Sequence, residues 1–541
     1  MTPVTDLRAA VEAAASALAN GDAGRSRPTL ERPKQADHGD YATNAALVLA
    51  PVLKAPPREV AERLGGALRD RLGDALDRVE VAGPGFLNLF LADPWYVGAI
   101  DWVLAAGEGY GGGGAAPALR VDIEFVSANP TGPLTAASGR HAAYGDALAR
   151  VLEFAGHEVV REYYFNDAGT QIEKFGASIR ARARSEEVPE GGYEGEYVRE
   201  LAAEIPGASD MDAHELARVG VELMFDHIKA TLHAYRVDFD VFFNERSLHE
   251  GNPSPVQRAF ERLSEEGHVY RSEGALWLRT TDFGDDKDRV LERSTGQPTY
   301  FAADVAYVEN KLERGFDQLI LPLGSDHHGY IARLKSIMGS LGADPARLEV
   351  PILQFVHVVE GGARASMSKR RGELITLDDL VAEIGVDATR WFMLSRSHDS
   401  TIDLDLDLAR QQSSENPVYY VQYAHARIAS VRRKAGKERV ARALTARPAA
   451  VELHPSERAL VKKLLAFPEE VAEAADRRAP HRVTVYALEL AQVFTAFYRD
   501  CQVVGAQPDA LEDWRLRLCV VSQRTIARAL DLLGVHAPDE M

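Results

Sequence analysis

Hydrophobic residues between positions 118 and 165 follow two different periods along the chain. Apolar and acidic residues alternate over 121–125, which predicts a short strand. Apolar residues recur at helical spacing over 138–155, and Gly156 is well placed to end that helix. Residues 159–165 supply a second strand. The order strand, helix, strand predicts a βαβ unit of a parallel sheet, with ligand sites at the carboxyl ends of the strands.

The same sheet is expected to continue after an interruption. Residues 174–234 are polar and helix-like and resemble an insertion. Short apolar runs return at 318–323 and 350–359, where further strands are predicted. These patterns indicate an α/β protein.

The N-terminal part has a pattern of its own. Apolar residues at helical spacing over 60–72 predict a helix, and the apolar run 86–91 predicts a strand. The glycine-rich stretch 111–117 closes a module of about 110 residues and is expected to be a flexible linker.

The C-terminal part is expected to be helical. From residue 378 onward no convincing strand appears, and apolar stripes at 456–465 and 487–497 have helical spacing. A helical bundle of about 130 residues is the simplest account.

Composition narrows the class of protein. Of the 541 residues, 46% are hydrophobic and 26% are charged, the balance of a soluble globular protein with roughly two to four domains. No apolar run is long enough to span a membrane, and the N-terminus lacks the pattern of a secretory signal. Cys501 and Cys519 cannot form a disulfide framework or a zinc site by themselves. We expect both to be buried in C-terminal helices, which favours a reducing cytoplasm.

The distribution of charge does not show whether the protein binds nucleic acid. The net charge of −19 argues against nucleic acid, but it is unevenly spread. Residues 411–541 hold 19 Lys and Arg against 16 Asp and Glu, a balance of +3, so the first 410 residues hold −22. A relatively basic C-terminal part could contact phosphates, and ordinary solvated helix faces explain the same charges equally well.

One polar cluster lies at the end of the first predicted strand. Glu124, Ser127 and Asn129 converge there, just before a predicted helix. The amino terminus of that helix offers free N–H groups and a positive dipole to an anion such as phosphate. A polar turn with a helix cap is the alternative.

A second cluster lies within a predicted helix. Tyr300, Asp304 and Tyr307 share one face, so a carboxylate lies between two aromatic rings. Such a face suits a guanidinium group, which takes a carboxylate partner and stacks on aromatic planes. An ordinary surface helix would have the same pattern.

Two further clusters are basic. His327 and His328 follow an apolar run and suggest phosphate donors or a metal site. The shared metal is the weaker option, because adjacent side chains on a strand point to opposite faces. Lys369, Arg370 and Arg371 form a basic segment that could neutralise a triphosphate. Solvated turns and loops are the alternatives for both.

Together these clusters are part of eight phrases that resemble the arginyl-tRNA synthetases, a class I aminoacyl-tRNA synthetase family. No single phrase would be decisive, but eight in the right order cover essentially the whole chain. The phrases are residues 39–44, 81–88, 127–134, 164–169, 326–330, 367–370, 415–427 and 532–535.

The resemblance implies a fold and a reaction. The fold is a class I Rossmann-type catalytic domain, over 118–400 with a helical insertion near 174–250. An N-terminal α+β tRNA-contacting domain (1–110) and a C-terminal all-α helical-bundle anticodon-binding domain (405–541) flank it. The reaction converts L-arginine and ATP, accompanied by Mg²⁺, to arginyl-adenylate and then transfers arginine to the 3′ end of tRNA(Arg). A cytoplasmic, monomeric enzyme with no metal site of its own is expected.

The resemblance also implies roles for residues that match the family's motifs. Arginine would contact Glu124, Ser127, Asn129, Tyr300 and Asp304, and tRNA would contact Phe86 and Asn88. ATP would contact Asn129, Pro130, Gly132, Gly139, Asp326, His327, Ser366, Met367, Ser368 and Lys369. Catalysis would rest on Lys369, Thr135 and Ser138.

Both ATP motifs depart from the family pattern. Thr135-Ala-Ala-Ser138 stands where His-x-Gly-His is expected, and Ser366 replaces the first lysine of Lys-Met-Ser-Lys. Loss of one preorganised donor typically costs about 10²–10³ in rate. Thr135 and Ser138 keep hydroxyl donors, and Arg140 and His141 lie within the next turn as further stand-ins. An active enzyme is therefore expected.

Two alternatives stay open from the sequence. One is a synthetase-like paralogue that binds tRNA or arginine without aminoacylation. The other is an enzyme that joins arginine to an acceptor other than tRNA, for which the C-terminal part would be dispensable.

Overall fold

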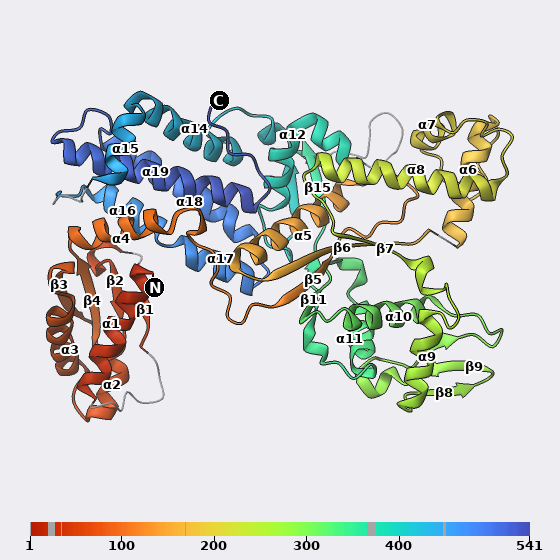
Figure 1. Cartoon of the computed structure of the whole chain (residues 1–541), viewed down its shortest axis with the longest axis horizontal. Coiled ribbons are helices and arrows are strands. Elements are labelled where there is room, and N and C mark those ends of the chain that lie inside the picture. The colour runs from red at the N-terminus through yellow and green to blue at the C-terminus, as the bar shows by residue number, and fades with distance from the viewer. Residues whose placement is uncertain (1, 20–27, 34, 168, 365–374, 447–450) are drawn as a thin grey trace.

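Figure 1 shows an elongated molecule in which the N-terminal part lies against the C-terminal helices, and the remaining elements extend to the other end. This computed structural model describes the chain except residues 1, 20–27, 34, 168, 365–374 and 447–450. None of the helices in the described part has the length and apolar character that a membrane crossing requires.

The central part is built on a five-stranded sheet of order β13-β11-β5-β6-β7, in which all neighbouring strands are parallel. The predicted βαβ unit is confirmed, since α5 (Ala136–Ala155) connects β5 (Arg120–Glu124) to β6 (Glu158–Phe165). Gly156 ends α5 in the left-handed region, at φ 111°. The other strands are β7 (Val241–Asn244), β11 (Gln318–Ile320) and β13 (Leu348–Glu349).

The segment that resembled an insertion is helical. It forms α6, α7 and α8, at the end of the molecule opposite the N-terminal part (Figure 1). Their bounds are α6 (Thr170–Ala183), α7 (Glu196–Glu204) and α8 (Ala213–Ala234). The chain then returns to the sheet through η4 (Glu245–Leu248), α9 (Pro255–Glu265), β8 (Val269–Ser272), β9 (Ala275–Leu278), η5 (Thr280–Phe283) and β10 (Arg289–Glu292).

Two helices and several short strands complete the central part. The helices α10 (Tyr300–Glu313) and α11 (Tyr330–Ser340) flank β11 along the chain. The short elements are β12 (Leu323–Gly324), η6 (Ser325–His327), η7 (Pro345–Arg347), β14 (Ile352–Leu353), β15 (Val356–Glu360) and β16 (Ala363–Arg364).

The N-terminal part combines helices with an antiparallel sheet of order β1-β2-β4-β3, and its predicted helix and strand are both present as α3 and β4. Its helices are α1 (Pro3–Leu18), α2 (Ala45–Leu53), α3 (Pro57–Leu72) and α4 (Asp93–Ala106). Its strands are β1 (Leu30–Glu31), β2 (Tyr41–Thr43), β3 (Leu76–Ala82) and β4 (Phe86–Leu91), with η1 (Ala36–His38), η2 (Gly73–Ala75) and η3 (Gly107–Gly109).

Gly111 and Gly112, at the start of the glycine-rich stretch 111–117, are packed against other elements, so the expectation of a flexible linker is wrong there. A Cβ at Gly111 would lie 2.4 Å from the Phe467 ring, and one at Gly112 would lie 2.5 Å from the Phe154 carbonyl oxygen. The Gly113 N–H donates to that same carbonyl at 2.8 Å. The glycines are needed because the backbone approaches α5 and the C-terminal helices closely.

The C-terminal part is helical with one exception. The strand β17 (Ile402–Asp405) pairs in parallel with β15, where only helices were expected. Its buried residues Ile402 and Leu404 alternate with acidic ones over four residues, too short a segment to stand out from the helical patterns around it. The helices are α12 (Leu377–Met393), α13 (Leu406–Ala409), α14 (Pro417–Ala435), α15 (Lys437–Thr445), α16 (Pro455–Leu464), α17 (Phe467–Asp476), α18 (His481–Asp500) and α19 (Asp509–Leu532).

The two cysteines are free and buried, as expected. Cys519 lies within α19, and Cys501 follows the end of α18. Burial raises the pKa of the Cys519 thiol to about 12, so this thiol is not a nucleophile at neutral pH.

Candidate active site

A cavity of about 640 Å³ lies at the carboxyl ends of β5 and β11 and is bordered by α5, α10 and α11. This is the position where parallel sheets bind ligands. The cavity brings together these residues that the sequence singled out: Glu124, Ser127, Ser138, His141, Asp304, Tyr307, Asp326 and His327.

Three buried carboxylates surround one lysine beside this cavity. Lys311 Nζ lies 2.5 Å from Asp122 Oδ2 and 3.1 Å from a carboxylate oxygen of both Glu124 and Glu162. Glu124 and Glu162 are neighbours because the parallel register pairs them across β5 and β6. Arg314 adds a second cation, 2.5 Å from Glu162. Buried carboxylates are tolerated here because each has a cationic partner.

These groups shift one another's pKa. Burial acts to lower the pKa of Lys311, but the three carboxylates outweigh burial and raise it. Burial acts to raise the pKa of Glu162, yet Lys311 and Arg314 bring it down to about 2. Burial raises the pKa of Asp122 to about 6, against the opposing effect of Lys311. Lys311 and Glu162 are therefore fixed charges at neutral pH.

Asp304, on α10, has no ion-pair partner within the part of the chain that the structure describes. The phenol of Tyr330 donates a hydrogen bond to Asp304 Oδ2. Burial raises the pKa of Asp304 to about 7, although the Tyr330 hydrogen bond acts to lower it. A cation beside Asp304 would favour its ionised form.

The charged groups of the cavity favour a cationic ligand. Among the lining residues, Asp122, Glu124, Asp304 and Asp326 supply four carboxylates, while Lys311 and Arg140 supply two cations. An excess of carboxylates in a partly enclosed site attracts a positive group such as a guanidinium.

The two aromatic rings predicted beside Asp304 have different environments. Tyr307 lines the cavity, and its hydroxyl donates to Glu162. Tyr300 is 69% exposed and lies outside the lining. Of the two predicted rings, Tyr307 therefore borders the cavity with Asp304 and Tyr300 does not.

The turn after β5 shapes the cavity wall. Val126 and Ser127 adopt left-handed backbone angles, with φ of 66° and 42°, which are uncommon for residues other than glycine. This turn brings Ser127 Oγ back to donate to Glu124 Oε1 at 3.1 Å. Strained conformations of this kind persist where the surrounding structure fixes them, often at functional sites.

Asn129 ties this turn to the segment after β6. Its Nδ2 donates to Gln171 Oε1 at 3.0 Å, and its Oδ1 accepts from the Asn166 N–H at 3.3 Å. Asn129 lies outside the cavity lining.

The amino terminus of α5 is joined to that of α12. Thr135 Oγ1 caps α5 by accepting from the Ser138 N–H at 3.4 Å. The Ala136 N–H donates to the Ile375 carbonyl at 3.1 Å, and the Leu377 N–H donates to the Leu134 carbonyl at 2.8 Å. Ser138 lines the cavity at the positive end of this helix, and its hydroxyl lies 3.4 Å from that of Thr135.

Arg140 is not a free phosphate donor, so its suggested role as a stand-in for the missing histidines is wrong. Its side chain is 2% exposed overall, and its guanidinium donates to the carbonyls of Gln354 at 2.6 Å, Ser397 at 2.9 Å and Ser400 at 2.8 Å. These bonds hold the loops before β15 and β17 in place.

His141 keeps its place as a candidate. It lines the cavity in the turn after Ser138. Burial, together with the Arg140 charge, lowers the pKa of His141 to about 4, so its imidazole is neutral at neutral pH. A neutral imidazole can donate one hydrogen bond but adds no charge at the phosphates.

Asp326 and His327 line the cavity from η6, a short 3₁₀ turn that follows the apolar run. Both side chains are exposed, and His327 Nε2 lies 3.6 Å from Asp326 Oδ2. Across the described ranges of the chain, no group of three or more His, Cys, Asp or Glu side chains could hold a metal ion.

Several predicted ATP contacts lie elsewhere. Gly139 lies against Leu377: a Cβ built on this glycine would be 2.8 Å from the Leu377 side chain. Residues outside the cavity lining are Pro130, Gly132, Thr135 and Gly139. Ser366, Met367, Ser368 and Lys369 lie outside the described residues.

The predicted tRNA contacts lie on the N-terminal part. Phe86 and Asn88, on β4, border a hollow of about 290 Å³ together with Arg32 and His38. The Phe86 side chain is 40% exposed, whereas Asn88 is buried. An exposed aromatic ring beside basic groups suits a nucleotide base and its backbone.

Sequence reasoning missed Lys311, Glu162 and Tyr330 as site residues. Lys311 could have been found by extending the face of Tyr300, Asp304 and Tyr307 by one more turn of the helix. Glu162 required the strand register, and Tyr330 required the packing of α11 against α10.

Three family models match the chain. "Arginyl tRNA synthetase N terminal domain" matches residues 5–91, and "tRNA synthetases class I (R), catalytic domain" matches 103–190 and 206–427. "DALR anticodon binding domain" matches 421–541. The three matches follow the order of the parts seen in the structure.

Individual proteins are similar over most of the length. An arginine–tRNA ligase from Frankia alni is 48% identical over 556 residues, covering 100% of this chain and 100% of that protein. A Campylobacter jejuni structure assigned as an arginyl-tRNA synthetase has a TM-score of 0.76 at 33% identity, covering 83% of this chain and 99% of that one. Thermus thermophilus arginyl-tRNA synthetase has a TM-score of 0.76 at 24% identity, covering 99% and 100%.

Proposed function

The chain belongs to the arginyl-tRNA synthetase family and is an arginine–tRNA ligase, and from this premise we propose how its residues divide the reaction. The expected fold is confirmed: a class I α/β catalytic domain with a parallel sheet, an N-terminal α+β domain and a C-terminal helical domain. The enzyme activates L-arginine with ATP to give arginyl-adenylate and transfers arginine to the 3′ end of tRNA(Arg).

We propose that Asp304 binds the guanidinium group of the substrate. Asp304 is a buried cavity carboxylate that forms no ion pair among the described residues, and burial raises its pKa to about 7, although Tyr330 and the charge of Arg333 act to lower it. This observation carries the proposal, because an incoming guanidinium would supply the missing charge. Tyr330 fixes the carboxylate by its hydrogen bond.

Glu124 and Ser127 would form the second contact to arginine. Both line the cavity, and the Ser127 hydroxyl and Lys311 hold the Glu124 carboxylate in place. That Asn129 and Tyr300 also contact arginine remains a prediction.

The phosphate chemistry would take place at the amino terminus of α5. An oxygen of the arginine carboxylate attacks the α-phosphorus of ATP, and pyrophosphate leaves. Negative charge grows on the α-phosphate oxygens, where the Ser138 hydroxyl and the helix dipole would stabilise it. Thr135 caps the helix that presents Ser138, and Asp326 and His327 would contact the nucleotide from the cavity edge.

The remaining predicted contacts of ATP are kept as proposals. Mg²⁺ would enter with the ATP phosphates and keep most of its waters. Four of these contacts lie outside the cavity lining: Asn129, Pro130, Gly132 and Gly139. The other four lie outside the described residues: Ser366, Met367, Ser368 and Lys369.

We propose that tRNA contacts the hollow at Phe86 and Asn88 and the C-terminal helices, with functional boundaries at 1–110, 118–400 and 405–541. The exposed ring of Phe86 supports the first contact. A monomeric state stays a prediction. A cytoplasmic location is also a prediction, and the two unpaired cysteines are consistent with a reducing compartment.

Aminoacylation with matched amino acids tests the proposed pocket. Citrulline has nearly the shape of arginine but carries no positive charge on its side chain. We expect tRNA(Arg) to be charged with arginine and not with citrulline, and Asp304→Asn to reduce that discrimination. Equal charging with both amino acids by the unmodified enzyme would contradict the role of Asp304.

A further inference from the structure

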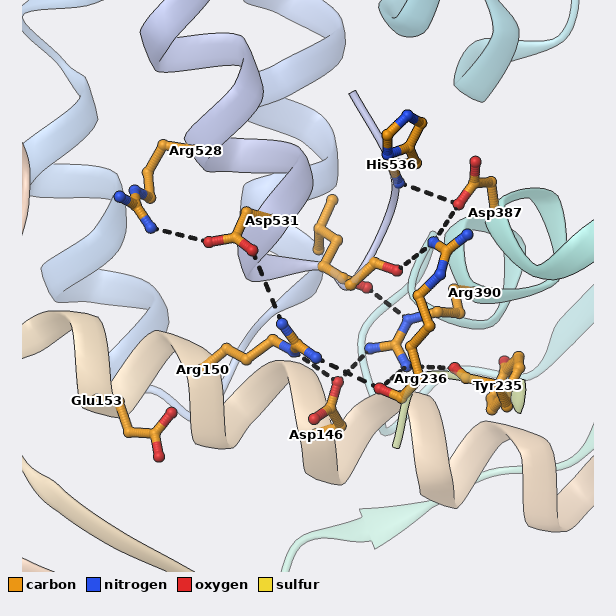
Figure 2. Close-up of polar contacts among 12 residues, drawn as sticks. Asp146, Arg150, Glu153, Tyr235, Arg236, Asp387, Arg390, Arg528, Asp531 and His536 are labelled. Atoms are coloured by element: carbon orange, nitrogen blue, oxygen red, sulfur yellow. Dashed lines mark hydrogen bonds and ion pairs between the residues drawn. The ribbon is translucent and has the colours of Figure 1, made fainter. Parts of the chain in front are cut away.

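A buried arginine joins α5, α12 and the turn after α19 (Figure 2), and neither Arg390 nor Asp146 lines the cavity. Arg390, on α12, is 0% exposed. Its Nη2 donates to Asp146 Oδ2 at 2.5 Å, on α5, and its Nε donates to the Leu533 carbonyl at 2.8 Å, after α19. Its Nη1 donates to the Tyr235 carbonyl at 3.0 Å, after α8. One guanidinium therefore contacts three separate segments as well as belonging to a fourth.

A second arginine strengthens this junction. Arg236 donates to Asp387 Oδ1 at 2.5 Å and to the Gly534 carbonyl at 3.0 Å (Figure 2). The His536 N–H donates to the same Asp387 oxygen at 3.0 Å. The turn that follows α19 is thus held against α12 by backbone groups as well as by Arg390.

Gly534 allows the turn to approach the guanidinium. Its φ is 65°, and a Cβ built on it would lie 2.3 Å from the guanidinium of Arg390. Residues 532–535 match a family phrase but take no part in the proposed reaction. The close packing of Gly534 on Arg390 explains why this phrase contains a glycine. Its glycine is required by contact with an arginine of another part of the chain.

The same two helices meet again at the catalytic end. Thr135, which caps α5, forms a bridge with Thr376, which caps α12. The helices are consequently tied at their amino termini and again at Asp146 and Arg390. Two ties restrict both sliding and rotation of α5 relative to α12, and so restrict the position of Ser138 in the cavity.

We propose that Arg390 is a positioning residue for adenylate formation: it holds α5 in the register with α12 that places Ser138 at the α-phosphate. Its contacts with Leu533 and Gly534 make this register depend on the docked C-terminal turn. The proposal rests on the role proposed above for Ser138. It predicts that damage to the junction slows the chemical step without weakening arginine, since Asp304 and Glu124 lie on other elements.

Arg390→Lys in the full-length enzyme tests this directly. Lysine keeps the charge but cannot reach all of the acceptors that the planar guanidinium serves. We expect kcat for arginine-dependent ATP–pyrophosphate exchange, with tRNA(Arg) present, to fall by about 10²-fold, because small misplacements far from the chemistry have effects of this size. The Kd for arginine, measured without ATP, should stay unchanged.

Arg517→Lys is the matched control. Arg517 is also buried, and it donates to the Ala443 carbonyl and to Asp101, which belong to α15 and α4. Within the described part of the chain its side chain bonds to neither α5 nor α12, so this variant should lose Tm to a comparable degree and keep kcat. Equal losses of kcat in the two variants, or an unchanged kcat in Arg390→Lys, would overturn the proposal.

Asp146→Asn covers the case in which Arg390→Lys does not fold. It keeps an acceptor oxygen for Arg390 and removes only the charge. A smaller fall in kcat at unchanged arginine Kd supports the proposal, and an unchanged kcat refutes it. Exchange by the unmodified enzyme is measured in parallel, and its absence would instead count against the proposed function.

Discussion

Replacing Asp304 by asparagine removes the carboxylate that we propose for the guanidinium while keeping the shape of the side chain. The amide can still accept the hydrogen bond from Tyr330, so the cavity wall should be preserved. Only the charge that meets the substrate is lost. The variant therefore isolates the electrostatic part of arginine recognition.

The magnitude follows from the environment of Asp304. Burial raises its pKa from 3.8 to about 7, so keeping it ionised in the empty cavity costs roughly 4 kcal/mol at about 1.4 kcal/mol per unit. A guanidinium would relieve this cost. A charge-assisted hydrogen bond contributes about 1.5–3 kcal/mol, which corresponds to a loss in arginine affinity of about 10- to 150-fold in Asp304→Asn. The Kd for ATP should hardly change.

The same pKa predicts a dependence of arginine binding on pH. Protonated Asp304 carries no charge, so affinity is full above about pH 7 and is lost as the pH falls through that value. Between about pH 8 and about pH 6 the ionised fraction falls roughly tenfold, and the Kd of the unmodified enzyme should rise by the same factor. Asp304→Asn should show no such change.

Titration calorimetry with arginine and with ATP, at several pH values, measures both effects. The control is Asp326→Asn, which removes an exposed carboxylate of the same cavity and should leave arginine affinity and its pH dependence unchanged. Equal weakening of arginine and ATP by Asp304→Asn, or a pH dependence that survives the substitution, would refute the reasoning.

Three further outcomes are expected. Thr135→His combined with Ser138→His should change kcat for adenylate formation more than the KM for arginine, because both positions lie at the amino terminus of α5, where we place the phosphate chemistry; an unchanged kcat would mean that other groups already fill the role. Tyr330→Phe removes a hydrogen bond that lowers the pKa of Asp304, so the pH midpoint of arginine binding should move upward, and a downward move would contradict the assignment. Phe86→Ala should raise the KM for tRNA by about tenfold at unchanged arginine Kd, as loss of a stacked ring costs about 1–3 kcal/mol, and an unchanged KM would remove Phe86 from the tRNA surface.

Elements with long, regular patterns could be predicted from the sequence. The 20 residues of α5 repeat their apolar stripe several times, and the alternation of acidic and apolar residues in β5 marks one polar and one apolar face. The hydrophobic period alone predicts the secondary structure of such segments, because each repeat places its apolar residues on the same face. The polar face of β5 then proved to be the wall of the cavity.

Features that depend on distant segments could not be predicted. The four residues of β17 become a strand only because β15 lies beside them. Gly111 and Gly112 resemble a linker until Phe467 and Phe154 are placed against them. From the sequence, Arg140 could donate hydrogen bonds to a phosphate. In the structure it donates instead to backbone carbonyls more than two hundred residues away in the sequence.

Arginine-dependent ATP–pyrophosphate exchange, with tRNA(Arg) present, tests the central claim most directly. The claim is that this chain forms arginyl-adenylate although Thr135 and Ser138 replace two histidines. We predict exchange that requires arginine and is not supported by citrulline. Absence of exchange by an enzyme that binds both tRNA(Arg) and arginine would contradict the claim.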